Sequence, residues 1–161
     1  MPDATTGGSA PAPRTIPPWW ARWRVRRVQV HDDSMGPTLA PGDRLLVDTA
    51  AFDGRPPAVG DVVVLVDPTA PARWLVKRVA GVGPGEFWRT SGGIEPLGPL
   101  DRPARPAEGI ETLALPPGTV FVLGDAGGRA RDSRQFGPVR LDALVGRAYR
   151  CYAPADRRRD L

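Results

Sequence analysis

The residues best suited to do chemistry in this chain are Ser34 and Lys77, which stand far apart in the sequence. A serine hydroxyl keeps its proton at neutral pH, so it becomes a nucleophile only when a neighbouring base removes that proton. Lys77 is the single lysine, because 21 of the 22 basic residues are arginine. Arginine cannot give up its proton in a protein, whereas a lysine withdrawn from water can become a neutral amine. The pair therefore predicts a serine nucleophile activated by a lysine base.

The sequence around Lys77 leaves two interpretations of this lysine open. Residues 74–80 (WLVKRVA) form a largely apolar run, in which burial would disfavour the ammonium form and lower the lysine pKa. In the second interpretation, the aliphatic stem packs on a sheet while the amine reaches water. Lys77 is a general base in the first case and a structural residue in the second.

Other catalytic chemistries find little support in the composition. His31, the single histidine, lies three residues before Ser34 and is expected on the same short strand. An imidazole there would struggle to turn back onto the serine, which disfavours a histidine-centred triad. Cys151 is the single cysteine, so an internal disulfide is excluded, and no Cys/His cluster has zinc-site spacing. We therefore expect no metal and no cofactor.

Short strands must bring the two reactive residues together, because turn-forming residues recur throughout the chain. The 20 prolines and 19 glycines interrupt any sustained helical period. Apolar or alternating segments bounded by turns predict strands over residues 28–31, 44–48, 62–66, 74–80, 119–123 and 146–152. A hairpin is expected around residues 87–93, followed by an exposed connection over 96–108. The 161 residues therefore predict one all-β domain with many short strands.

Composition divides the chain into four segments. Residues 1–18 are rich in Pro, Ala, Thr and Gly and predict a disordered leader. An arm over 19–27 interleaves tryptophan with arginine, 28–154 would form the catalytic domain, and 155–161 a basic tail. The net charge of +4 resides at the two ends, because residues 31–154 carry 14 basic and 15 acidic groups. This neutral body argues against a nucleic-acid groove across the domain.

The Trp/Arg-rich arm also has two interpretations. Its residues Trp19, Trp20, Arg22, Trp23 and Arg24 suit contact with the anionic surface of a membrane. Alternatively, its tryptophans pack on an edge of the domain. No stretch reaches the roughly 18 consecutive apolar residues that a membrane span needs, and the N-terminus lacks the hydrophobic region of a secretory signal. We expect a cytoplasmic protein or one that binds a membrane peripherally.

Several segments together resemble the type I signal peptidase family, whose members use a Ser/Lys dyad. The resemblance covers about residues 28–152, with the segments in the order that the family has. The matching segments are 34–39 (SMGPTL), 42–47 (GDRLLV), 60–63 (GDVV), 77–79 (KRV), 122–125 (VLGD), 132–139 (DSRQFGPV) and 144–147 (LVGR). The resemblance implies an antiparallel β fold and cleavage of N-terminal signal or leader peptides after an Ala-x-Ala type site.

The resemblance also implies a role for each matching residue at the reaction centre. Ser34 becomes the nucleophile and Lys77 the general base. Asp132 and Arg134 become an ion pair that fixes the loop behind the lysine. Taken without the resemblance, that pair would be an ordinary surface salt bridge, worth under about 1 kcal/mol.

Substrate binding follows from the same resemblance. The extended substrate backbone would add as a strand alongside Leu75 and Val76, a mode of peptide recognition that uses the exposed edge of a sheet. Small substrate residues at P1 and P3 would fit shallow apolar pockets formed partly by Met35 and Val76.

Three departures from the family pattern bear on activity. Asp32 stands where the family usually has a serine or glycine beside the oxyanion hole, and an ionised carboxylate would repel the developing oxyanion. Either Asp32 points away and backbone N–H groups such as that of Ser34 stabilise the oxyanion, or turnover is poor. Ala126 replaces the asparagine that commonly follows Gly-Asp. Ala130 replaces a serine that hydrogen-bonds the lysine, so Ser133 or a water would orient the amine.

Three alternatives accompany the signal peptidase hypothesis. As a short relative of the signal peptidases without a membrane anchor, the chain resembles the maturation proteases that trim leaders from cytosolic precursors such as nickel superoxide dismutase. The nucleophile segment also resembles the self-cleaving Ser/Lys repressors, but residues 1–33 contain neither a DNA-binding domain nor an Ala-Gly cleavage site. The departures from the family pattern at Asp32, Ala126 and Ala130 motivate the third alternative, a catalytically impaired module that binds leader peptides. Our leading hypothesis is a Ser/Lys endopeptidase for N-terminal signal or leader peptides.

Overall fold

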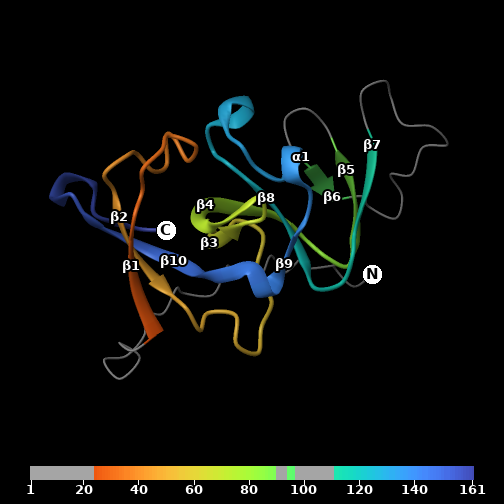
Figure 1. Cartoon of the computed structure of the whole chain (residues 1–161), viewed down its shortest axis with the longest axis horizontal. Helices are drawn as coiled ribbons and strands as arrows, with labels where there is room; N and C mark the ends of the chain where they lie inside the picture. Colours follow the sequence, from red (N-terminus) through yellow and green to blue (C-terminus); the bar gives the residue numbers. More distant parts are fainter. Residues whose placement is uncertain (1–23, 90–93, 97–110) are drawn as a thin grey trace, which may run out of the picture.

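Antiparallel strands are the main secondary structure in the computed structural model, which describes residues 24–89, 94–96 and 111–161 (Figure 1). The larger sheet has eight strands, in the order β1-β2-β10-β3-β4-β8-β9 with β11 on β10. Its strands are β1 (Val25–Gln29), β2 (Arg44–Asp48), β3 (Val62–Asp67), β4 (Ala70–Val82), β8 (Thr119–Leu123), β9 (Val139–Arg140), β10 (Leu144–Ala153) and β11 (Arg159–Asp160). The prediction of an all-β fold is confirmed.

The second sheet lies beside β4 and β8 and has three strands (Figure 1). It consists of β6 (Ile94–Pro96), β5 (Gly85–Arg89) and β7 (Glu111–Leu115), in that order. The helical elements are α1 (Ser133–Phe136), η2 (Gly127–Arg129), η3 (Leu141–Ala143) and η4 (Ala155–Arg157). Each covers a single turn, as expected for a chain without a sustained helical period.

The core has two faces because β3 runs through the middle of the larger sheet, between β10 and β4. Successive side chains of a strand point to opposite faces of the sheet. Val62 and Val64 accordingly pack in one apolar cluster, with Met35 of the loop after β1. Val63 and Leu65 pack in the other cluster, which extends over β4 and β8. The apolar run over 62–66 is thus a strand buried on both faces, as its composition predicts.

The strand edges that lack a partner within the described residues include one edge of β1 and one of β4. β1 is the outer strand of the larger sheet and pairs only with β2. β4 pairs with β3 along most of its length, but β8 pairs with β4 only from Arg78 to Val82. The first half of β4 therefore keeps one open edge, with unpaired backbone donors and acceptors.

The ends of the domain differ from the segment boundaries that composition suggests. β1 begins at Val25, inside the predicted arm, because its residues pair with β2. Of the arm's proposed membrane contacts, Arg24 alone is described, and its exposed guanidinium pairs with Asp53 at 3.3 Å. Several predicted features lie outside the residues that the structure describes: the leader 1–18, Trp19, Trp20, Arg22, Trp23, the turn 91–93 and most of the connection 96–108.

The C-terminal segment 155–161, predicted as a basic tail, belongs to the fold. It forms η4 and β11, and β11 pairs with β10. Arg157 forms an ion pair with the buried carboxylate of Asp43, with Nε 2.7 Å from Oδ1. Leu161 packs against the core. Within the described part of the chain, no helix has the length and apolar character needed to cross a membrane.

Candidate active site

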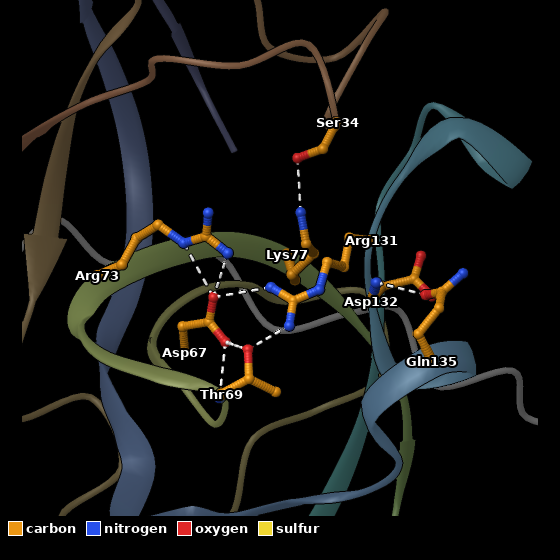
Figure 2. A network of polar contacts seen from close by, with 8 residues as sticks. All are labelled: Ser34, Asp67, Thr69, Arg73, Lys77, Arg131, Asp132 and Gln135. Atoms are coloured by element: carbon orange, nitrogen blue, oxygen red, sulfur yellow. Dashed lines mark hydrogen bonds and ion pairs between the residues drawn. The ribbon is translucent and has the colours of Figure 1, made fainter.

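The structure brings the Ser34 hydroxyl and the Lys77 amine into hydrogen-bond contact, with 2.6 Å between Oγ and Nζ (Figure 2). Only 1% of Lys77 and 9% of Ser34 is exposed to solvent. The interpretation in which the amine reaches water is therefore wrong, because the whole lysine side chain is buried. Within the described residues, no carboxylate forms an ion pair with this amine.

Strand β4 places Lys77 on the same face of the sheet as Leu75 and Val79, two residues away on either side. Val63 of the buried strand β3 stands opposite Lys77 in the strand register. Burial lowers the pKa of Lys77 below the ordinary value of a lysine, since the charged form loses its hydration. The carboxylates of Asp32 and Asp132 oppose this effect without cancelling it. The site therefore favours a neutral amine at lower pH than an exposed lysine would allow.

Ser34 lies in a tight turn between β1 and β2. The Gly36 N–H donates to the Asp33 carbonyl at 2.9 Å, and the Leu39 N–H donates to the Met35 carbonyl at 2.8 Å. Met35 and Leu39 are buried and anchor the turn in the core. The turn that carries Ser34 is thus held by its own backbone hydrogen bonds and by these two buried side chains.

Asp32 does not point away from the reaction centre. Its Oδ1 accepts the backbone N–H of Ser34 at 3.0 Å. Partial burial raises the pKa of Asp32, but the hydrogen bonds from Ser34 and the charge of Lys77 outweigh this effect and place the pKa below its usual value. The Ser34 N–H therefore donates to an ionised carboxylate and is not available to an oxyanion. Of the two arrangements expected for Asp32, this one is less favourable for catalysis.

An ion pair joins Asp132 to Arg134, with 2.7 Å between Oδ2 and Nη2. Asp132 is fully buried, and its carboxylate also accepts the Gly124 N–H at 2.9 Å. It caps α1 as well, while its own N–H donates to Gln135 Oε1 at 2.8 Å (Figure 2). This carboxylate joins β8 to α1 behind the lysine.

Ser133 does not orient the lysine amine. Its hydroxyl accepts the Val122 N–H at 3.0 Å, and the hydrogen bond described for the Lys77 amine is the one with Ser34. Ala130 is buried against Gly124 and offers no hydroxyl. The serine hydroxyl is thus the polar partner of the amine among the described residues.

Gly124 brings the loop after β8 into contact with the turn that carries Ser34. The Ala126 N–H donates to the Ser34 carbonyl at 3.0 Å. A Cβ atom at position 124 would lie 2.5 Å from the Ser34 carbonyl oxygen and 2.3 Å from the Ala130 Cβ. Both distances are well inside van der Waals contact, so only glycine fits here.

Gly124→Ala is expected to lower kcat/KM of any reaction that uses the Ser34/Lys77 pair by about 10-fold, because displacing a reactive group by a fraction of an ångström already slows catalysis. The matched control is Gly128→Ala, since a Cβ atom at position 128 meets no atom within 4 Å. The comparison uses the kinetics of both variants and their thermal unfolding. Equal kcat/KM in both would contradict the proposed contact.

Arg78 and Asp125 form a second support that the sequence analysis missed. The guanidinium binds the Asp125 carboxylate through two hydrogen bonds of 2.8 and 2.6 Å. Its Nη1 also donates to the Gly60 carbonyl at 2.9 Å, and Nη2 lies 3.4 Å from Thr38 Oγ1. Arg78, the residue after Lys77, thereby connects the turn that carries Ser34, the loop before β3 and the loop after β8. The signal in the sequence that could have pointed to Arg78 was its position directly after Lys77.

A groove of about 540 Å³ opens beside the Ser/Lys pair. Its walls come from the unpaired edges of β1 and β4, with residues 27–31 on one side and residues 72–74 and Val76 on the other. Met35 and Val76 line it. Leu75 does not, because its side chain packs in the core below β4. Leu75 is therefore placed to contribute backbone groups instead of a pocket wall.

A metal centre finds no support in the described part of the chain. Residues 24–89, 94–96 and 111–161 contain no group of three or more His, Cys, Asp or Glu side chains that could hold an ion. His31 is exposed on the rim of the groove.

Known proteins resemble this chain over most of its length. The family model described as "Signal peptidase, peptidase S26" matches residues 21–94 and 98–153. A probable signal peptidase I-1 from Synechocystis sp. is 31% identical over 80% of this chain and 71% of its own length. The mitochondrial ATP-independent inner membrane protease subunit 1b of Arabidopsis thaliana is 37% identical over 71% of this chain and 62% of its own. A crystal structure of a signal peptidase I from Enterococcus faecalis is 23% identical, with a TM-score of 0.44 over 58% of this chain and 97% of that one.

Proposed function

Because the chain belongs to the signal peptidase family, peptidase S26, we propose that it is a serine endopeptidase that removes N-terminal signal or leader peptides with a Ser34/Lys77 dyad. The observation that carries this proposal is the buried contact of 2.6 Å between the hydroxyl and the amine. A serine needs a base within hydrogen-bond reach, and a buried lysine without an ion-pair partner can be that base at moderate pH.

The proposed reaction proceeds through an acyl-enzyme. The neutral amine of Lys77 takes the proton of the Ser34 hydroxyl as Oγ attacks the scissile carbonyl carbon. The resulting ammonium gives this proton to the nitrogen of the leaving peptide as the C–N bond breaks. Lys77 then takes a proton from a water that attacks the ester, and Ser34 recovers its proton when the ester bond breaks.

The groove supports binding of the substrate as an extended strand. A peptide laid between the open edges of β1 and β4 can hydrogen-bond the backbone of one strand or both. The partly exposed Val76 and the buried Met35 leave room for small side chains such as alanine at P1 and P3. An Ala-x-Ala type cleavage site is therefore the proposed specificity.

The direct test is cleavage of a synthetic leader peptide with an Ala-x-Ala site, followed by mass spectrometry of the products. The wild-type protein is expected to cut after the second alanine, and Ser34→Ala to leave the peptide intact. Circular dichroism of Ser34→Ala controls for folding. Equal processing by the wild type and this variant would reject the proposal.

The pH dependence of activity is expected to follow the Lys77 amine. Because burial lowers its pKa from the ordinary lysine value, kcat/KM should rise with pH and level off below the value at which an exposed lysine titrates. The sign follows from the base being active only when deprotonated. A kcat/KM that stays constant from about pH 6 to about pH 10 would contradict a lysine base.

A second candidate function is a module that binds leader peptides without cleaving them. The observation that favours it is the Asp32 carboxylate on the Ser34 N–H, where an oxyanion would need a donor. Binding of the same peptide without any product would identify this function. A membrane contact through the arm and a single cytosolic precursor as substrate both stay predictions.

A further inference from the structure

A buried carboxylate beside the groove holds two arginines from different parts of the fold. Asp67, at the end of β3, is fully buried. Its Oδ2 accepts Arg73 Nε at 2.9 Å and Arg131 Nη1 at 3.0 Å. Figure 2 shows the two guanidinium groups approaching Asp67 from different sides, with Ser34 and Lys77 nearby.

Both carboxylate oxygens of Asp67 already accept at least two hydrogen bonds each. Its Oδ1 accepts both the N–H and the hydroxyl of Thr69, at 2.9 and 2.8 Å. Burial would raise the pKa of Asp67, but the hydrogen bonds from Thr69 and the arginines outweigh it, so the carboxyl group stays ionised. Since two guanidinium groups share this one carboxylate, the unit keeps one positive charge in excess.

Arg73 is the member of the unit that faces the groove. It lines the groove wall together with Trp74 and Val76, and 56% of its side chain is exposed. Its Nε and Nη2 bind Asp67, whereas Nη1 has no hydrogen-bond partner among the described residues. The guanidinium is therefore held in place with a donor still available to a bound peptide, so a ligand need not pay for ordering it.

Few other ionisable groups line the groove among the residues that the structure describes. Arg27 lines the opposite wall, where its guanidinium lies 5.8 Å from the centre of the Tyr152 ring. Asp32 is the acidic residue of the lining, and its carboxylate accepts the Ser34 N–H. His31 completes the set. Both walls of the groove thus present arginine, and the charge of Arg73 also acts on Asp32, where it helps to lower the pKa of the carboxyl group.

From this arrangement we infer that the groove selects leader peptides with an aspartate or glutamate shortly before the scissile bond, read by Arg73. The inference rests on the proposed function, because it assumes that the groove holds the leader. Arg73 precedes Lys77 by four residues on the same strand, which is about 13 Å along it. The inference takes the N-terminal side of the leader to run from Lys77 toward Arg73. An arginine side chain spans several ångströms, so the acidic residue then falls between P2 and P5, with P3 left for a small residue.

The first experiment changes the substrate alone. Peptides with an Ala-x-Ala site carry glutamate or its neutral counterpart glutamine at P2, P4 or P5, and kcat/KM is measured with the wild-type protein. At one of these positions, glutamate is expected to be favoured by about 5- to 10-fold, as for a partly exposed charge-assisted hydrogen bond. Raising NaCl from about 0.05 M to about 0.5 M should reduce this preference. Equal rates for glutamate and glutamine at all three positions would overturn the inference.

The second experiment assigns the preference to Arg73. In Arg73→Gln, the ratio of the glutamate rate to the glutamine rate is expected to fall to about one, while Arg73→Lys keeps part of the preference. The matched control is Arg140→Gln, since Arg140 is exposed, pairs with Asp142 and does not line the groove. Thermal unfolding of each variant controls for the loss of an Asp67 partner. An unchanged ratio in a folded Arg73→Gln variant would also overturn the assignment.

Failure of the inference and failure of the proposed function give different results. If the protein cleaves both peptides equally, the peptidase stands and the acidic preference falls. If it cleaves neither, fluorescence anisotropy with labelled peptides and the Ser34→Ala variant measures binding instead. Tighter binding of the glutamate peptide would then support the inference for a leader-binding module, and equal affinities would reject it.

Discussion

Lys77→Met is expected to abolish peptide cleavage, by about 10³-fold or more, and at the same time to raise the melting temperature. Methionine has a similar length and fills the buried space that the lysine side chain occupies. The reaction loses its base, and unassisted serine is a weak nucleophile. The fold loses a buried amine whose desolvation is unfavourable, so a gain of about 1 kcal/mol, or roughly 2–4 °C, is expected.

The two readouts together separate a base from a structural lysine. A lysine kept for packing or hydrogen bonding would lower the melting temperature when it is replaced, and activity would fall only with the folded fraction. Kinetics at several pH values and differential scanning calorimetry measure both quantities. Ser34→Ala serves as the companion variant, because it removes the nucleophile but keeps the lysine. Retained cleavage in a folded Lys77→Met protein would refute the dyad.

Asp32→Gly is expected to raise kcat by about 10- to 100-fold, because a single oxyanion donor is worth about 10² or more in related acyl transfers. In the structure, the Asp32 carboxylate accepts the Ser34 N–H at 3.0 Å. Removing it leaves that N–H available to the oxyanion and removes a negative charge that would repel it. Steady-state kinetics with a saturating leader peptide measure the change.

A pH profile gives a second readout of the same variant. The Asp32 charge favours the ammonium form of Lys77, so removing it lowers the pKa of the amine further. The rising limb of kcat/KM should therefore move to lower pH. The matched control is Asp33→Gly, since Asp33 is also exposed and its backbone carbonyl, not its side chain, accepts the Gly36 N–H. A lower kcat in Asp32→Gly, with the fold intact, would mean that the carboxylate assists the reaction.

Local patterns in the sequence were sufficient to predict the strands that form the body of the domain. The apolar run over 62–66 becomes β3, and the alternating segment 44–48 becomes β2 with the same bounds. Side-chain alternation and turn residues act over a few positions, so they can be read without knowing the partner strand. The boundaries of β4 were less accessible, because its extension to Ala70 depends on pairing with Asp67 across the turn.

Contacts between distant segments were out of reach of such patterns. Asp125 and Arg78 were visible as motif residues, but their pairing needs β8 to lie beside β4. The ion pairs of Asp67 likewise join distant segments, and the sequence spacing of Asp67, Arg73 and Arg131 does not predict that the three residues meet. Helix α1 was missed because it is one turn long and is stabilised by the Asp132 cap instead of an apolar stripe.

The sequence by itself determined which residues could react: one lysine among arginines, a serine in a turn rich in glycine and proline, and strands to carry them. Only the tertiary structure decided that the amine is buried, that it lies 2.6 Å from the hydroxyl, and that a carboxylate occupies the Ser34 N–H. The physical reason is that residue type sets an ordinary pKa and a local backbone preference. Desolvation and hydrogen-bond occupancy depend on what distant parts of the chain place around each group.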